Sequence, residues 1–166
     1  LYGIFHSANA TTTIGSTTVT YNNISLGQGA NGNSVTAIRA GSSGQTGGTV
    51  TISNNTIHDC TFDAGASGQF YGIFQEFNNT TSYIDNNTFE KNNLNTTNAN
   101  TYLIYDNGVT STMSVDGNYM NNNSVTTTGT VNLTGYYYIN TGATGTINVA
   151  NNIIDSLMIP SASTGY

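Results

Sequence analysis

The feature that most constrains this chain is an internal repeat of about 33 residues, a period typical of solenoids and other repeat arrays. Two short motifs share that period. The first reads aromatic, any residue, isoleucine and usually a second aromatic, and its isoleucines are Ile4, Ile38, Ile73, Ile104 and Ile139. The second reads β-branched residue, two turn residues, asparagine, any residue and apolar residue, and it closes at Ile24, Ile57, Phe89, Met120 and Ile154. Because both motifs recur together, we expect a row of similar units, each packed against its neighbours.

The residues between the motifs indicate strands rather than helices. Residues 49–52 (TVTI) and 112–115 (TMSV) alternate with a period of two, which is the period of a strand. The chain contains 29 Thr, 26 Asn and one Pro, and only 6% of its residues are charged. Helical repeats need helix formers and charged faces, and propeller blades need four strands in about 40 residues. We therefore predict an all-β right-handed parallel β-helix of about five rungs, each 31–35 residues long.

Parallel stacking places equivalent residues in columns about 4.8 Å apart. Besides the isoleucines of the first motif and the closing residues of the second, the predicted inward columns are Val19, Ile52, Ile84, Val115 and Val149, and Phe62, Leu94, Val125 and Ile159. One further column contains a single residue type: Asn22, Asn55, Asn87, Asn118 and Asn152. We expect these asparagines at a sharp corner, in the left-handed conformation that Asn tolerates. Their amides are expected to form a ladder of hydrogen bonds from rung to rung.

The segment Ile84-Asp85-Asn86-Asn87-Thr88-Phe89 and its relatives resemble the repeat of right-handed parallel β-helices of the pectin-lyase-like class. The resemblance extends over essentially the whole chain and implies an architecture rather than an activity, because that class contains lyases, hydrolases, phage tailspikes and adhesins. The Thr-, Asn- and Gly-rich composition resembles that of very large repetitive surface adhesins of bacteria. We therefore expect residues 1–166 to form a single solenoid segment, an excerpt of a longer repeat array, that is extracellular or at the cell surface.

Charge and hydropathy exclude several classes of partner. The net charge is −6, and the two basic residues, Arg39 and Lys91, cannot neutralise a phosphate backbone, so nucleic acid is not an expected partner. No apolar run approaches the roughly 20 residues that a membrane span needs. The lone Cys60 cannot form an intrachain disulfide, and we interpret it as a small buried apolar residue.

The sequence offers few candidates for catalysis. The resemblance to uronate lyases implies calcium-binding aspartates beside an arginine or lysine base. Arg39, however, has Phe5 and Phe74 as its column neighbours, with no carboxylate evident there. We therefore predict no catalytic residues and no enzyme. Asp85 and Asp116 should lie on adjacent rungs, where a solvated corner is the leading interpretation. A weak calcium site and the carboxylate pair of a retaining glycosidase are the alternatives; no other cofactor is expected.

Aromatic residues on the outward face of the first motif are the candidate binding site. Phe5, Phe74 and Tyr105 share one predicted outward column, with Tyr138 and Leu103 beside it. Such rings could stack on sugars, dock a neighbouring chain or be covered by the long loops.

Taken together, these patterns predict a structural or adhesive solenoid segment of a large secreted or cell-surface protein. A carbohydrate-binding or carbohydrate-active domain is the first alternative, and a self-assembling extracellular filament subunit is the second. The expected partners are neighbouring rungs or domains of the same long chain, surface glycans or other copies of the chain.

Overall fold

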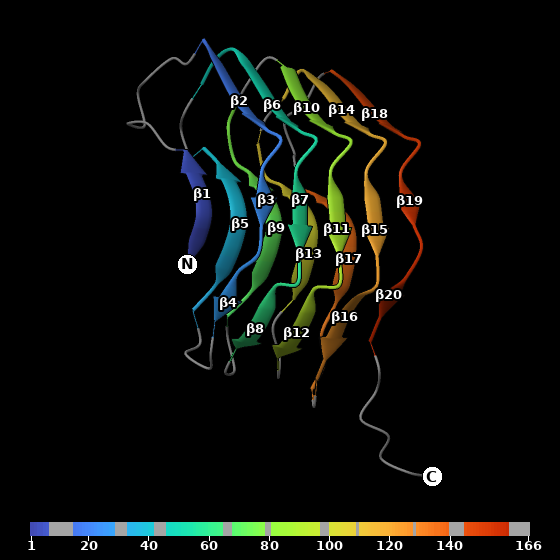
Figure 1. Cartoon of the computed structure of the whole chain (residues 1–166). Coiled ribbons are helices and arrows are strands. Elements are labelled where there is room, and N and C mark those ends of the chain that lie inside the picture. Colours follow the sequence, from blue (N-terminus) through green and yellow to red (C-terminus); the bar gives the residue numbers. More distant parts are fainter. Residues whose placement is uncertain are drawn as a thin grey trace.

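The computed structural model of the chain describes residues 1–6, 15–28, 33–41, 46–64, 68–78, 81–96, 100–108, 110–127, 129–139 and 145–159. These residues form β-strands and no helix (Figure 1). The strands stack into four sheets of five strands each, and the strand pairs are parallel.

The first two sheets contain the longer strands. The first sheet consists of β1 (Tyr2–His6), β5 (Val35–Ala40), β9 (Phe70–Gln75), β13 (Thr101–Asp106) and β17 (Leu133–Tyr138). The second consists of β2 (Ser16–Thr20), β6 (Thr49–Ser53), β10 (Thr81–Asp85), β14 (Thr112–Asp116) and β18 (Thr146–Ala150).

The other two sheets contain strands of two to four residues. The third sheet consists of β3 (Asn23–Ile24), β7 (Thr56–His58), β11 (Thr88–Glu90), β15 (Tyr119–Asn121) and β19 (Ile153–Ile154). The fourth consists of β4 (Gly27–Gln28), β8 (Thr61–Ala64), β12 (Asn93–Thr96), β16 (Asn123–Thr126) and β20 (Leu157–Met158).

Each turn of the chain passes through the four sheets in order. The chain completes four turns between β1 and β17, and its fifth turn continues through β18, β19 and β20. In Figure 1 the first sheet rises on the far side, the third descends on the near side, and each later turn lies further to the right. The winding is therefore right-handed, as in nearly all parallel crossovers. The predicted parallel β-helix is confirmed, with about four complete turns instead of five.

The core consists of apolar columns between the sheets. The column that begins Val19, Ile52, Ile84 is in register as predicted, and so is the column of closing residues of the second motif. Phe62, Leu94 and Val125 also share one column. These columns form because strand alternation sends every second side chain inward, and each then meets an apolar neighbour above and below.

The predicted first-motif column is wrong in the fifth turn. Ile4, Ile38, Ile73 and Ile104 are in register, but the residue opposite Ile104 is Tyr136. Ile139 lies beyond β17 and is exposed. The residue of the fifth turn that matches the earlier turns is Gly135, which lies in the same column of the sheet as Gly3 and Gly72. These glycines face the third sheet so closely that a Cβ at Gly72 would lie 2.7 Å from the ring of Phe89.

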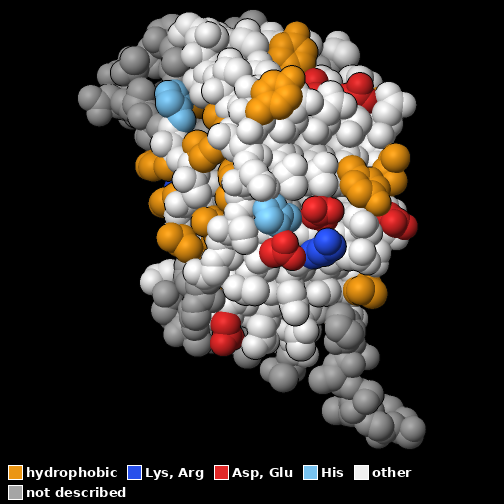
Figure 2. Space-filling model, viewed as in Figure 1, with side chains coloured by type: hydrophobic (Ala, Val, Ile, Leu, Met, Phe, Trp, Pro, Cys, Tyr) orange, Lys and Arg blue, Asp and Glu red, His pale blue; other side chains and the backbone are white. Residues whose placement is uncertain are grey.

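The outer surface of the solenoid, formed by the side chains that alternate with the inward ones, carries little charge on the face shown in Figure 2. Figure 2 shows the near face mostly in white, the colour of uncharged polar side chains and backbone. A small group of charged side chains lies over β7 and β11. There His58 contacts Asp59 (Nδ1 to Oδ2, 2.7 Å), and Glu90 is opposite His58 in the sheet.

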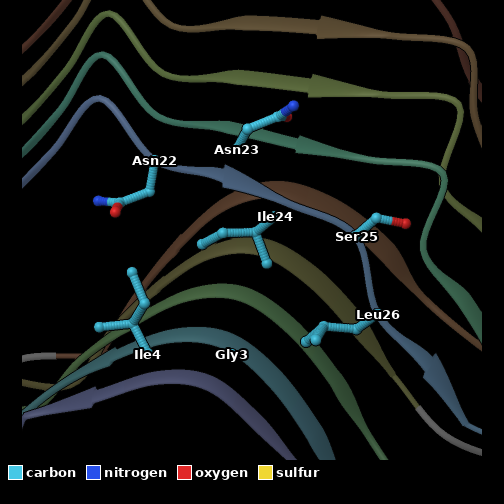
Figure 3. Close-up of a pocket in the computed structure, with 7 residues that line it drawn as sticks. All are labelled: Gly3, Ile4, Asn22, Asn23, Ile24, Ser25 and Leu26. Atoms are coloured by element: carbon cyan, nitrogen blue, oxygen red, sulfur yellow. The ribbon is translucent and has the colours of Figure 1, made fainter.

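The two ends of the solenoid differ. At the C-terminal end the last members of the inward columns are open to solvent: Val149 is 52% exposed and Ile154 is 57% exposed, whereas Val115 and Met120, one turn earlier, are each 1% exposed. At the N-terminal end Val19 and Ile24 are buried. A hollow remains there beside β1 and β3, and the side chains of Ile4, Ile24 and Leu26 are among those that line it (Figure 3).

The predicted asparagine ladder is present. Asn22, Asn55, Asn87, Asn118 and Asn152 form one column, and in each turn the backbone N–H and the Nδ2 group donate to Oδ1 of the next asparagine at 2.9–3.1 Å. Nδ2 also donates to a backbone carbonyl, as from Asn87 to Ile52 at 2.8 Å. Asn55, Asn87 and Asn118 have no exposed surface. The ladder therefore satisfies the amides of the three buried asparagines and joins them to the partly buried Asn22 and Asn152.

The predicted conformation of the ladder asparagines is wrong. The left-handed residue is the one before each of them: Tyr21 (φ 58°), Asn54 (φ 56°), Asn86 (φ 56°), Gly117 (φ 64°) and Asn151 (φ 51°). The reversal of the chain at this residue turns the next side chain into the core. Ladder and corner are thus separate requirements at adjacent positions.

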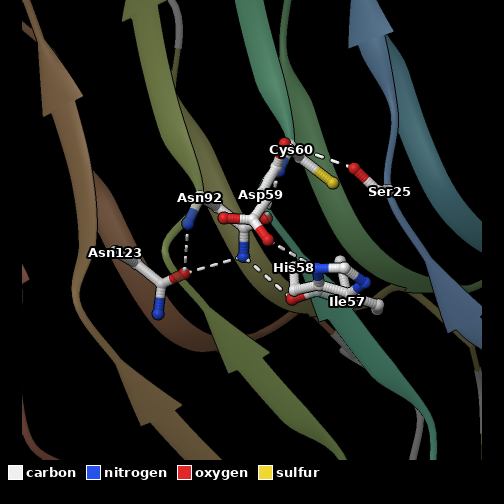
Figure 4. A network of polar contacts seen from close by, with 7 residues as sticks. All are labelled: Ser25, Ile57, His58, Asp59, Cys60, Asn92 and Asn123. Atoms are coloured by element: carbon white, nitrogen blue, oxygen red, sulfur yellow. Dashed lines mark hydrogen bonds and ion pairs between the residues drawn. The ribbon is translucent and has the colours of Figure 1, made fainter.

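A second corner repeats this arrangement with fewer asparagines. Asp59, Lys91 and Asn122 have positive φ, and the residue after each of them, Cys60, Asn92 or Asn123, points inward and is buried. Nδ2 of Asn92 donates to Oδ1 of Asn123 at 2.7 Å, and Oδ1 of Asn92 accepts the backbone N–H of Cys60 at 3.0 Å (Figure 4). This shorter ladder was missed because cysteine and leucine occupy other turns of the column. Cys60 is buried, as interpreted from the sequence.

Candidate functional site

The outer face of the first sheet carries a cluster of rings that we call the aromatic strip. Its members are Tyr2, Phe5, Tyr71, Phe74, Tyr102, Tyr105 and Tyr137. In β1, β9 and β13 two rings can point outward because the two residues between them face the core, as buried Gly72 and Ile73 do. Ring centroids within a strand are 4.8 Å apart for Tyr2–Phe5 and 4.9 Å apart for Tyr71–Phe74.

The rings also contact each other from strand to strand. Phe74 meets Tyr105 edge to face at 5.0 Å, and Tyr105 stacks on Tyr137 at 5.5 Å. Tyr102 is buried beneath its neighbours, whereas Tyr2, Phe5 and Tyr137 are exposed. The strip is therefore a connected aromatic surface whose accessible parts lie in the first and last turns.

Arg39 fills the position that a ring would take in β5. Its guanidinium carbon lies 5.3 Å from the Phe5 ring centroid and 5.1 Å from that of Phe74, which places it for cation–π contacts with both. Nη1 donates to the Tyr2 hydroxyl at 2.9 Å. Arg39 thus joins the rings of the first and third turns into one surface.

The prediction that no carboxylate accompanies Arg39 is wrong. Nη2 of Arg39 donates to Oε2 of Glu76 at 2.6 Å. Phe74 is the direct partner of Arg39 in the sheet, so Glu76 is its diagonal neighbour two residues further on, a contact that a column alignment does not display. Partial burial alone would lower the pKa of Arg39, but the hydrogen bond and charge of Glu76 outweigh it and the pKa is raised.

Two predicted members of the binding face lie elsewhere. Tyr137, not Tyr138, is opposite Tyr105, because the fifth turn is shifted as described above. Tyr138 is opposite Asp106 and packs partly against the core, and Leu103 is fully buried. Phe5, Phe74 and Tyr105 occupy the outward column as predicted.

Tyr71 and Tyr105 of the strip are neutral groups. Burial, followed by the neighbouring Tyr105 and Tyr102, raises the pKa of Tyr71 to about 12. Burial and the same kind of neighbour also raise the pKa of Tyr105. Because Glu76 balances Arg39, the strip offers uncharged ligands a surface without a strong field.

Asp85 and Asp116 lie on adjacent turns, as predicted, at the ends of β10 and β14. Oδ1 of Asp85 accepts the backbone N–H of Asp116 at 3.0 Å and the hydroxyl of Ser114 at 2.9 Å. Oδ1 of Asp116 accepts Nδ2 of Asn151 at 2.8 Å. Each carboxylate therefore ties its own turn to the next. Their binding of calcium stays a prediction, and the described residues contain no group of three or more His, Cys, Asp or Glu placed to hold a metal.

Asp106 is a buried carboxylate that the sequence analysis missed. It has no exposed surface, Oδ1 accepts the backbone N–H of Gly108 at 2.8 Å, and Oδ2 is a buried atom with no hydrogen-bond donor among the described residues. Its sheet neighbours are Gln75 and Tyr138. Burial raises the pKa of Asp106 to about 7. The only sequence signal was an acidic residue at a position where the other turns have histidine, alanine, glutamine and tyrosine.

Comparison of the chain with protein-family models, with curated proteins and with solved structures finds no match. Within the described residues no helix is long and apolar enough to cross a membrane. The function is therefore inferred from the geometry of the solenoid and its aromatic strip.

Proposed function

We propose that this chain is a structural and adhesive solenoid segment of a large secreted or cell-surface protein. The observation that carries the proposal is the asparagine ladder, which joins every turn to the next through hydrogen bonds that are buried in the middle turns and partly buried at the two ends. The asparagines that recur in every turn therefore hold neighbouring turns together. A stack of this kind gains length by adding turns, since each turn contacts only its neighbours. Further turns or domains of the same long chain are its first partners.

The aromatic strip supports the adhesive part of the proposal. Tyr2, Phe5 and Tyr137 are exposed on a rigid sheet, and aromatic side chains held in place provide a large contact area at little entropic cost. On the near face of the side wall most exposed side chains are uncharged and polar, with exposed tyrosines such as Tyr21 and Tyr83 and one small group of charged residues (Figure 2). Contacts with surface molecules would therefore concentrate on one side of the rod.

Bead adhesion under flow tests this role. Beads coated with the chain should be retained on cell-surface or matrix preparations, and the variant Tyr2→Ser/Phe5→Ser/Tyr137→Ser should lose most of that retention. The matched control is Tyr21→Ser/Tyr83→Ser, since Tyr21 and Tyr83 are exposed outside the strip. Retention no better than that of bare beads would contradict the adhesive role. Protease treatment of intact source cells tests the location, because an internal protein would survive it.

Carbohydrate binding is the second candidate, and the exposed neutral rings favour it. Sugar rings stack on aromatic faces, and the strip combines exposed faces with tyrosine hydroxyls. Titration with a panel of polysaccharides, followed by tyrosine fluorescence, should show binding that Phe5→Ser weakens and Tyr83→Ser does not. Binding that is indifferent to Phe5→Ser would exclude the strip as the sugar site.

Catalysis is not part of the proposal. Incubation with pectins, alginates and other polysaccharides in the presence of calcium should release no unsaturated or reducing ends. Release that is abolished by Asp85→Asn or Asp116→Asn would show that the chain is an enzyme after all.

A further inference from the structure

The chain leaves β13 through Asp106, Asn107 and Gly108, which place a reactive peptide bond beside a buried carboxylate. An asparagine followed by glycine is the pair in which the next backbone nitrogen most readily attacks the side-chain amide, because glycine has no Cβ to hinder the approach. Oδ1 of Asp106 accepts the N–H of Gly108 at 2.8 Å. The proton that this attack must remove therefore lies within reach of a base.

The fold requires the glycine of this pair. Gly108 is buried, and a Cβ there would collide with the carbonyl oxygen of Phe77 and with the side chain of Gln75. A larger residue that would hinder the attack is thus excluded at this position. The backbone N–H of Asn107 donates to the carbonyl of Gln75 at 2.9 Å, which holds the chain in place just before the reacting nitrogen.

The side chain of Asn107 is free to react. It is exposed, and none of the residues that the structure describes forms a hydrogen bond with it. It can therefore turn toward the nitrogen of Gly108, and water reaches it. Asn87 is the opposite case, because both polar atoms of its buried side chain have partners.

We propose that Asn107 is a site of intramolecular deamidation for which Asp106 is the general base. Oδ1 of Asp106 takes the proton of the Gly108 N–H, and the nitrogen forms a bond to Cγ of Asn107. The bond from Cγ to Nδ2 breaks, and Nδ2 takes up the proton from Asp106 and leaves as ammonia. Water then opens the cyclic imide at either carbonyl, so residue 107 becomes aspartate or isoaspartate. The inference is independent of the proposed adhesive function.

The surroundings of Asp106 give the reaction a distinct dependence on pH. Its neighbour in β9 is the uncharged Gln75, and β17 contributes Tyr138 and Tyr136, the second with a pKa raised by burial. Burial raises the pKa of Asp106 to about 7, so the carboxylate is a base only above that pH. The rate at Asn107 should rise up to about pH 7 and level off above it, whereas deamidation driven by hydroxide keeps rising.

The variant Asp106→Asn tests the proposal, because the amide still offers an acceptor to the Gly108 N–H but is not a base. Peptide mapping by mass spectrometry follows the conversion of residue 107 in the folded chain at pH 8. The variant should slow this conversion roughly tenfold or more. Asn31, which precedes the other glycine of this kind in the sequence and lies outside the described residues, is an internal reference. Its rate should be the same in both chains.

Two controls separate base catalysis from the other effects of the substitution. Asp63→Asn makes the same charge change at an exposed position and should leave the rate at Asn107 unchanged. In urea the wild-type chain should react more slowly at Asn107 than when folded, because the base is no longer held against the N–H. Circular dichroism checks that both variants keep the fold.

Three results would overturn the proposal. One is a folded wild-type chain that reacts more slowly at Asn107 than the chain in urea, since the Asp106 contact would then only hold the turn. The others are equal rates at Asn107 in the wild type and Asp106→Asn, and an equal slowing in Asp63→Asn and Asp106→Asn.

Discussion

Asn87 and Asp106 are both polar side chains without exposed surface, yet the fold accommodates them in opposite ways. Asn87 belongs to a column of identical residues, and its Nδ2 and Oδ1 atoms both have partners. Asp106 lies in a column of different residue types, and one of its two oxygens has no hydrogen-bond donor in the part of the chain that the structure describes. Burial of a polar group costs little free energy where the adjacent turns carry the same residue, because each copy then supplies the hydrogen-bond donor or acceptor that its neighbour requires. A solitary polar group has no such neighbour.

The largest expected effect follows from removing the middle of the ladder. Asn87→Leu would remove the acceptor of the Asn55 backbone N–H and the side-chain donor to the carbonyl of Ile52, and it would leave Nδ2 of Asn55 with the carbonyl of Val19 alone. Each orphaned buried group costs about 1–3 kcal/mol, so we expect a loss of about 3–5 kcal/mol in the free energy of unfolding. Urea denaturation followed by circular dichroism measures it. A loss below that of an exposed control, Tyr83→Leu, would show that the ladder contributes nothing to stability.

The second effect is a dependence on pH that comes from Asp106. Its pKa is raised to about 7 in the folded chain and is about 3.9 in an unfolded one. The folded state therefore holds the proton more tightly. Protonated Asp106 therefore contributes its full share to the free energy of unfolding below about pH 4. This share, on the order of 4 kcal/mol at most, is lost as the pH rises to about 7.

Asp106→Asn isolates this contribution, because the amide is neutral at every pH used. The variant should be more stable than the wild type at pH 8, and the difference should shrink as the pH falls toward 4. Tyr136, which lies near Asp106, stays uncharged over this range, since burial raises its pKa further. A stability difference that does not vary with pH would mean that Asp106 is ionised in the fold.

A smaller effect is expected in the second ladder. Oδ1 of Asn92 accepts only one hydrogen bond from the preceding turn, from the backbone N–H of Cys60, whereas Oδ1 of Asn87 accepts two from Asn55. Asn92→Leu should therefore cost about 2–3 kcal/mol, less than Asn87→Leu. Cys60 gives a local readout: burial raises its pKa to about 11, so alkylation at pH 8 reports opening of this corner. An equal loss of unfolding free energy in Asn92→Leu and Asn87→Leu would show that the number of accepted hydrogen bonds does not distinguish the two ladders.

The smallest effect concerns the corner itself. Asn86 is exposed and left-handed, so Asn86→Gly should change stability by less than about 0.5 kcal/mol, whereas Asn86→Val should cost about 1–2 kcal/mol. Asn87→Gly, one residue later, keeps the conformation but loses the ladder and should resemble Asn87→Leu. Thermal unfolding of the three variants compares them. If Asn86→Val and Asn86→Gly behave alike, the corner does not require a left-handed residue.

Most of the fold was predictable because stacking turns a repeat in the sequence into a column in space. The asparagine column and the apolar columns follow directly from the spacing. The left-handed position was assigned one residue late, because both corner residues are often asparagine and only the backbone distinguishes them. The fifth turn was misaligned because Tyr137, Tyr138 and Ile139 imitate the first motif, whereas the packing depends on Gly135.

The candidate site was less predictable, because its contacts are not repeated. Glu76 reaches Arg39 diagonally from the neighbouring turn, and a column alignment compares only direct neighbours. Asp106 gave no pattern, since its burial depends on packing at the end of β13. The sequence period identifies the columns that all turns have in common. Residues that occur in one turn only, such as Glu76 and Asp106, are identified by their contacts in the structure.

The parallel pairing of the turns also has a mechanical consequence. The hydrogen bonds between turns run along the axis of the rod, so a pull on its two ends loads the turns in series and opens them one at a time. A turn of about 33 residues that rises about 5 Å when stacked can extend to roughly 110 Å once released. A tether built from such turns would lengthen in large steps under load, and each released turn could fold back onto the exposed edge of the turn that remains.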